Sequence, residues 1–94
     1  MGKPYLITYD LKSPSPKYEE VISTIKETLA TSGWCSYWRS SFLIKSRYTP
    51  DQMLEMLKPY INSGDRFLII EVVNNKQGWL TEKQWKFINE NIVD

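Results

Sequence analysis

The sequence predicts an α+β protein, a ferredoxin-like βαββαβ sandwich with an extra C-terminal helix. Three stretches, residues 4–11, 34–46 and 66–73, are rich in aromatic and β-branched residues, which is typical of strands. Two segments with the apolar spacing of helices lie between them, and a third such segment follows the last. Residues 34–46 can form one bent strand or two short ones. Two short strands would complete the element order of the ferredoxin-like sandwich.

The first predicted strand, residues 4–11, is apolar on most of both faces, which favours a central place in the sheet. Alternation along the strand gives one face of Tyr5, Ile7 and Tyr9 and another of Leu6, Thr8 and Asp10. Asp10 stands at the end of this strand, before a polar loop with two prolines. Because ligands often bind where a strand passes into a loop, Asp10 is a candidate for chemistry.

The first helix is predicted to begin at Ser15-Pro16, since serine caps helices and proline fits the first helical position. Its apolar stripe runs to about residue 30, and Gly33 follows as a stop signal. Beyond it, Arg39-Ser40 separates the two halves of residues 34–46. No Asn-Gly or Asp-Gly pair marks a hairpin turn there.

The second and third helices each begin with a capping box, a threonine followed three residues later by a glutamine. Thr49 and Gln52 start the second helix, and Pro59 is expected to kink it or end it early. Thr81 and Gln84 start the third. If the first two helices cover one face of the sheet, the other face is exposed to water, covered by the last helix or buried in a dimer.

The composition indicates one soluble domain, 1–94, that a dimer interface would help to stabilise. With 12 Lys and Arg against 11 Asp and Glu, the chain lacks the basic excess of a dedicated nucleic-acid binder. The absence of histidine excludes His-based triads and zinc sites, and the lone Cys35 excludes an intramolecular disulfide. No apolar run approaches the roughly 20 residues of a membrane span, and residues 1–4 do not resemble a signal peptide. We therefore expect a cytoplasmic protein without membrane contact.

Several motifs occur in an order found in one known family. They are the pair Tyr9-Asp10, an aromatic-Ser-Phe strand, Thr49-Pro50 before a helix, and the sequence Asp-Arg-Phe-Leu-Ile-Ile-Glu-Val at 65–72. Over residues 4–73 the chain resembles the CRISPR-associated Cas-two family, whose architecture virulence-associated protein D shares. It resembles still more closely a group of uncharacterised bacterial and phage proteins, some called SinR-like. These carry Gly-Trp-Leu before a last helix, here Gly78-Trp79-Leu80.

This resemblance implies a homodimer with a ferredoxin-like fold. Some members of the Cas-two family are metal-dependent nucleases that use the aspartate ending the first strand, which is Asp10 here. The resemblance thus implies Asp10 as a catalytic residue and as a ligand of Mg²⁺ or Mn²⁺, completed by the symmetry-related Asp10 of a dimer. Other members act only as structural adaptors. An aspartate at a strand end can also simply bind loop amides, and residues 12–16 replace the Arg-rich stretch that usually follows in the family.

Two further sets of side chains are candidates for binding. Basic residues that meet at one sheet edge would contact phosphates, although ordinary solvated charge is the alternative. The candidate nucleic-acid-binding residues are Lys12, Arg39, Lys45 and Arg47. Of the four tryptophans, we expect two or more in the core and one or two at a protein interface, with a ligand cage as the alternative. The candidate interface residues are Trp34, Trp38 and Trp79.

The leading functional hypothesis is a small homodimeric binding or adaptor protein, with a role in phage–host conflict. One alternative is a metal-dependent endoribonuclease or deoxyribonuclease that uses Asp10 across the dimer. The other is a protein that binds a small ligand. Ser40 and Ser41 have no candidate base beside them, so the sequence offers no nucleophilic catalytic pair.

Overall fold

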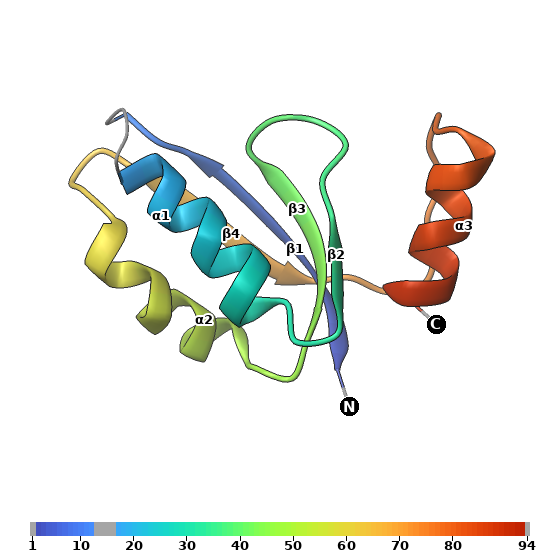
Figure 1. Ribbon diagram of the computed structural model, residues 1–94, viewed down its shortest axis with the longest axis horizontal. Coiled ribbons are helices and arrows are strands. Elements are labelled where there is room, and N and C mark those ends of the chain that lie inside the picture. Colours follow the sequence, from blue (N-terminus) through green and yellow to red (C-terminus); the bar gives the residue numbers. More distant parts are fainter. Residues whose placement is uncertain (1, 13–16, 94) are drawn as a thin grey trace.

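The computed structural model describes residues 2–12 and 17–93, which form four strands and three helices (Figure 1). The strands are β1 (Lys3–Asp10), β2 (Gly33–Cys35), β3 (Ser41–Ser46) and β4 (Arg66–Glu71). The helices are α1 (Lys17–Thr24), α2 (Pro50–Leu57) and α3 (Glu82–Asn91). A π-helical turn, Ile25–Leu29, extends α1, and a 3₁₀ turn, Lys58–Tyr60, extends α2. No helix of the described chain is long and apolar enough to cross a bilayer.

The strands form one antiparallel sheet in the order β2-β3-β1-β4. Thr8 of β1 lies opposite Ser41 of β3 on one side and opposite Leu68 of β4 on the other. The prediction that the first strand is central is confirmed. An α+β protein with a four-stranded antiparallel sheet and three helices is compatible with the predicted ferredoxin-like sandwich.

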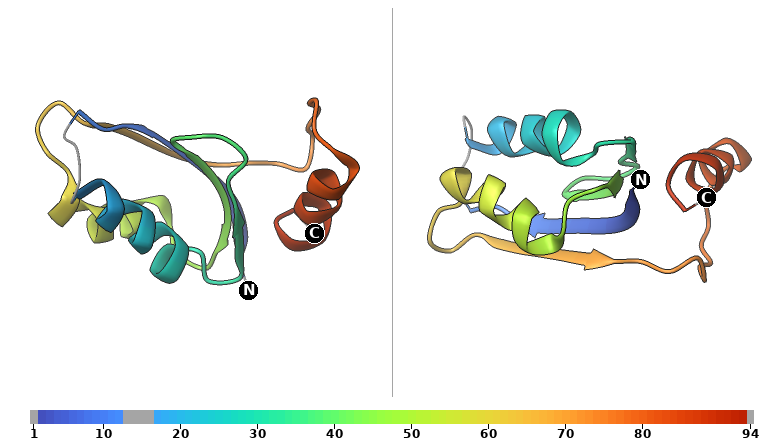
Figure 2. Two further views of the ribbon diagram at one scale, coloured as in Figure 1. Left: turned by 45° about the horizontal axis from the view of Figure 1, so that its top comes forward. Right: turned by 90° about the horizontal axis from the view of Figure 1, so that it is seen from below.

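The main core lies between the sheet and the helices α1 and α2, which pack on the same face (Figures 1 and 2). The sheet contributes every second residue of β1, as the alternation predicts. Its fully buried aliphatic side chains include Ile7, Ile25, Ile44 and Leu57. Each such side chain contributes roughly 1.5–3 kcal/mol of transfer free energy, so this layer carries most of the fold's stability.

The opposite face of the sheet is only half covered. There α3 packs against β2 and β3 through a second core of Cys35, Ile88, Ile92 and Val93. Figures 1 and 2 show α3 standing apart from α1 and α2, at the end of the extended segment that follows β4. The last helix therefore covers the β2–β3 half of this face and leaves the β1–β4 half open.

Local sequence signals match the observed element ends closely. Both capping boxes form, with Thr49 and Thr81 each accepting a hydrogen bond from the amide three residues later. The α-helical part of α2 ends at Leu57, before Pro59, as predicted. The predicted cap at Ser15-Pro16 lies outside the described residues.

Residues 34–46 form two strands joined by a hairpin, which resolves the alternative that the sequence left open. In this hairpin Ser40 adopts a φ of 63°, in the left-handed region that asparagine and glycine usually occupy. Its carbonyl accepts hydrogen bonds from the Tyr9 amide and the Thr8 hydroxyl, at 3.1 and 3.3 Å. These bonds hold the turn against the end of β1 and explain how it forms without Asn-Gly.

Candidate functional site

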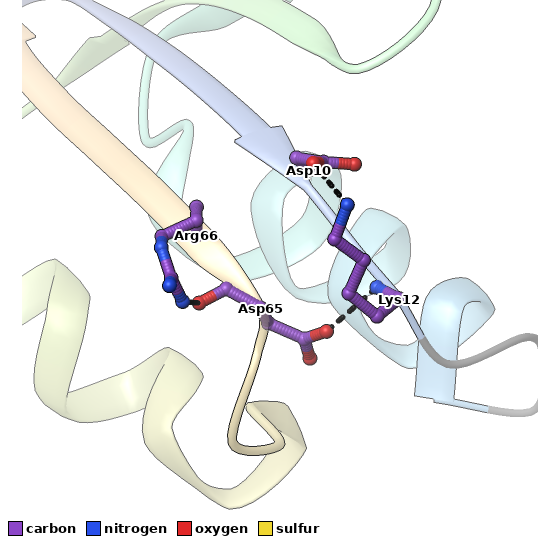
Figure 3. Close-up of polar contacts among 4 residues, drawn as sticks. All are labelled: Asp10, Lys12, Asp65 and Arg66. Carbon is purple, nitrogen blue, oxygen red and sulfur yellow. Dashed lines mark hydrogen bonds and ion pairs between the residues drawn. The ribbon is translucent and has the colours of Figure 1, made fainter.

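Asp10, the predicted catalytic and metal-binding residue, ends β1 and lies opposite Arg66 of β4. Its carboxylate is 64% exposed and forms a 2.9 Å ion pair with the Nζ of Lys12, which is equally accessible (Figure 3). Ion pairs between exposed side chains contribute about 1 kcal/mol or less. Asp10 therefore faces solvent at the end of β1, and its ion pair with Lys12 restrains it only weakly.

A second acid, Asp65, reaches the same loop from the start of β4 and is almost completely buried, with 8% exposure. One carboxylate oxygen accepts a hydrogen bond of 2.7 Å from the Lys12 amide, and the other accepts one of 2.9 Å from the Asn62 amide. Its backbone carbonyl accepts a hydrogen bond from the Arg66 guanidinium (Figure 3). Asp65 is thus an acid that binds loop amides, a role that the sequence offered for Asp10.

In the sequence, Asp65 stands out only as the first residue of the motif at 65–72, although Asn62-Ser63-Gly64-Asp65 has the composition of a turn. The signal that points to its role is the turn itself, since aspartates in turns often accept bonds from nearby amides. The partner amide of Lys12 is 53 positions away, and no local pattern indicates it.

In the part of the chain that the structure describes, no cluster of metal-binding side chains accompanies Asp10. Mg²⁺ in proteins is bound by one or two carboxylates together with water or phosphate oxygens. Within residues 2–12 and 17–93, no three side chains of metal-binding type gather into a group that could hold an ion. Asp65 already uses both oxygens on backbone amides. Among the described residues, Asp10 therefore offers a metal ion a single carboxylate, without a cluster of further protein ligands.

The predicted nucleic-acid-binding residues are divided between the two ends of the sheet. Lys12 follows β1, and Arg39 lies in the hairpin whose turn is bonded to the same end of β1. Lys45 lies opposite Pro4, near the start of β1. Four residues of β3 separate Lys45 from the hairpin end, which corresponds to about 13 Å at the usual rise of a strand.

Arg47 also belongs to the far end. Its amide donates to the Thr31 hydroxyl, and its guanidinium lies over the ring of Tyr48 at 5.3 Å from the ring centroid. Lys12 and Arg39 thus lie at one end of the sheet, and Lys45 and Arg47 lie at the other. The four do not form the single basic edge that the prediction required.

The three predicted interface tryptophans are all exposed, although they lie in different places. Trp79, in the segment before α3, is 100% exposed, and Trp38, in the hairpin, is 64% exposed. Trp34 lies on β2, on the face that α1 covers, opposite Ile44. Of the four tryptophans, Trp85 packs against the second core, beneath α3, so the expectation of two or more core tryptophans is wrong.

Trp38 and Trp79 come together at a largely apolar pocket of about 260 Å³. This pocket lies between the sheet, the segment 72–80 and α3. Its other apolar lining residues are Leu43, Val72, Val73, Leu80, Trp85, Ile88 and Val93. We refer to it as the apolar pocket.

The uncovered half of the sheet adjoins this pocket. Leu6 lies between Leu43 of β3 and Ile70 of β4. The side chains of these three residues form a row across the sheet, from the apolar pocket to the edge strand β4. Leu68 and Ile70 are 54% and 48% exposed. We call the surface of Leu6, Thr8, Leu68 and Ile70 the open sheet face. Contiguous exposed apolar side chains of this kind are typical of interaction sites.

A second cavity of about 370 Å³, here called the aromatic cleft, lies between α1 and the β2–β3 hairpin. Its aromatic lining residues are Tyr9, Tyr18, Trp34, Tyr37, Trp38 and Phe42. Two cations, Lys26 and Arg39, also line it. Burial, followed by interaction with Tyr18, raises the pKa of Tyr9 to about 12, while the charge of Arg39 partly opposes the shift.

Cys35 is buried in the second core, and this burial raises the pKa of its thiol. A protonated, enclosed thiol is a poor nucleophile. Cys35 therefore acts as a small buried hydrophobe and does not belong to a reactive site.

No known protein-family model matches this chain, and no curated protein matches it either. The likeness to the Cas-two family therefore remains a resemblance carried by the motifs of the sequence.

Proposed function

We propose that this protein is a small homodimeric adaptor of ferredoxin-like, Cas-two-like fold, whose two copies associate through the open sheet face. The observation that carries the proposal is the pair Leu68 and Ile70, which are about half exposed on a strand whose alternate residues face the core. Burying the exposed halves of these side chains contributes roughly 1 kcal/mol each, and a two-fold dimer contains four of them.

The edge of the sheet supports the same association. The Val72 amide bonds to the Pro4 carbonyl, which continues the ladder between β4 and β1. Because backbone groups of successive strand residues point to opposite edges, those of Phe67, Ile69 and Glu71 point away from β1. β4 is the last strand of the sheet, and an edge strand with apolar side chains readily pairs with another chain.

A dimer interface of ordinary size would cover a modest share of the surface. A specific interface buries about 800 Å² on each partner, roughly one-eighth of the 6306 Å² that the chain exposes. We place the open sheet face at its centre, and the fully exposed Trp79, at the adjoining apolar pocket, supplies a large apolar ring. With a net charge of +1, two copies repel each other little.

The adaptor role is favoured over the nuclease alternative by the chemistry around Asp10. Its carboxylate is exposed and paired with Lys12, and the neighbouring acid is committed to backbone amides. The role in phage–host conflict rests on the resemblance alone.

Sedimentation velocity across a wide range of micromolar concentrations tests the dimer. We expect the native protein to sediment as a dimer and Ile70→Lys to sediment as a monomer with an unchanged circular dichroism spectrum. Thr28→Lys, which adds the same charge at an exposed position on the other side of the sheet, is the matched control and should remain dimeric. A native protein that is monomeric throughout would refute the proposal.

The nuclease alternative has its own test. The purified protein is incubated with labelled single-stranded and duplex RNA and DNA in the presence of Mg²⁺ or Mn²⁺. Cleavage that disappears in Asp10→Ala would replace the adaptor role with a nuclease role, whereas no cleavage by either protein supports the adaptor.

A further inference from the structure

We propose that the aromatic cleft of each protomer binds a mononucleotide, with its base against the tryptophan rings and its phosphate near Lys26 and Arg39. The cleft lies on the face of the sheet that α1 and α2 cover, so it is separate from the open sheet face. The proposal is therefore independent of the dimer.

The rings of the cleft form a continuous aromatic series. Tyr9 stands edge-on to Tyr18 with ring centroids 6.4 Å apart, and it stacks on Phe42 at 6.5 Å. Phe42 in turn lies 5.8 Å from Trp34. Trp38, on the hairpin, adds a second indole at the rim, with most of its surface in water. Tyr9 and Phe42 are buried, whereas Trp34 and Trp38 are exposed. Exposed indole rings can stack on any nucleobase, because every base has a flat π-face.

The charge of the cleft points to an anionic ligand. Lys26 holds its ammonium 4.8 Å from the ring centroid of Trp34, and Arg39 is close enough to influence the ionisation of Tyr9. No carboxylate lines the cleft, and within the described chain no ion pair neutralises either cation. Two cations beside stacked rings match a ligand that carries both a flat base and a phosphate.

Hydroxyl groups complete the polar lining. Tyr9 and Tyr18 both line the cleft, and the hydroxyl of the buried Tyr9 interacts with that of Tyr18. Ser36 and Ser40 also line the cleft. Its volume of about 370 Å³ falls in the range of sites for small organic ligands and suits a base, a ribose and one phosphate together.

Isothermal titration calorimetry at low ionic strength tests the proposal with AMP, GMP, CMP and UMP. We expect at least one nucleotide to bind, and we expect two fragments to bind at least about tenfold more weakly. Adenosine lacks the phosphate, and ribose 5-phosphate lacks the base. Adenosine cannot make the charged contacts, and ribose 5-phosphate cannot stack on the rings. The loss of either contribution should weaken the binding affinity by about a factor of ten or more.

The position of the ligand is read from the indole N–H signals of the four tryptophans by NMR, assigned through single Trp→Phe variants. Binding in the aromatic cleft shifts the signals of Trp34 and Trp38 and leaves that of Trp79 in place. Binding in the apolar pocket would instead shift Trp79 and spare Trp34, which would overturn the assignment.

Charge-removing variants complete the test. Lys26→Gln and Arg39→Gln should each weaken nucleotide binding about tenfold, because each removes one charged contact to the phosphate. Lys86→Gln removes an equivalent charge from the exposed surface of α3 and should bind as the native protein does. Ile70→Lys should also bind normally, because it alters only the open sheet face.

Three results would overturn the proposal. The first is that none of the four nucleotides binds at millimolar concentration. The second is that ribose 5-phosphate binds as tightly as AMP. The third is that Lys26→Gln and Arg39→Gln both bind nucleotide with the affinity of the native protein. A monomeric native protein that still binds AMP in the cleft would reject the dimer and leave the nucleotide site standing.

Discussion

Replacing Asp65 by alanine should destabilise this protein more than replacing any exposed acid. The carboxylate is nearly buried and accepts hydrogen bonds from the amides of Lys12 and Asn62. It thereby joins the loop after β1 to the turn before β4. Asp65→Ala leaves both amides without this acceptor in a site that water reaches poorly.

The magnitude follows from these two bonds. A hydrogen bond to a charged group contributes about 1.5–3 kcal/mol, and unsatisfied buried donors add a desolvation cost. Since water can enter the enlarged site and replace part of the loss, we expect Asp65→Ala to lower the free energy of unfolding by about 3 kcal/mol. That is a large share of the roughly 5–15 kcal/mol of a typical domain. Asp10→Ala, which removes one exposed ion pair, should cost less than about 1 kcal/mol.

Urea unfolding followed by circular dichroism measures both variants against the native protein. All samples need the same protein concentration, because a dimer's stability depends on it. If Asp65→Ala and Asp10→Ala lost similar amounts of free energy, the amide-binding role assigned to Asp65 would be wrong. Asp65→Asn, which keeps one oxygen acceptor, should lie between Asp65→Ala and the native protein.

Three other predictions concern the aromatic cleft, the buried thiol and the last helix. Burial raises the pKa of Tyr9 from 10.0 to about 12, so the unfolded chain loses this proton first and stability should fall as pH rises through that interval. Urea unfolding at several pH values should show a smaller fall for Tyr9→Phe, and identical curves would contradict this reasoning. The Cys35 thiol is protonated and enclosed, so it should react with a disulfide reagent only slowly until urea unfolds the chain. A fast reaction of the native protein would show that α3 does not cover this thiol. Thr81→Ala should weaken α3 by about 1 kcal/mol, seen as faster amide hydrogen exchange there, while Lys83→Ala, which leaves the cap intact, should not.

Much of the fold could be predicted because its signals are local. A capping box joins residues three positions apart, and the threonine and glutamine pairs before α2 and α3 both form as predicted. The alternation of Tyr5, Ile7 and Tyr9 places them on the face that becomes the core. Pro59 ends the α-helical part of α2 through the amide that it lacks.

Less of the candidate site could be predicted, since it depends on distant pairings. Lys12 and Lys45 resemble members of one basic edge in the sequence, yet the register of β1 with β3 puts them at opposite ends. Leu68 and Ile70 cannot be told from core residues by pattern, because both faces of their strand are apolar. Lys26 joins the aromatic cleft only because α1 crosses the sheet beside Trp34.

The sequence by itself determined where most of the strands and helices form, how α2 and α3 start, and that Asp10 ends the first strand. Propensity, alternation and capping act over a few residues, so they are present in the linear order. Only the tertiary structure decided that Asp65 is the buried acid, that α3 covers half of one sheet face, and that rings and cations meet in the aromatic cleft. Those features arise from contacts between segments far apart in the chain, and strand register and packing, which no local pattern encodes, set them.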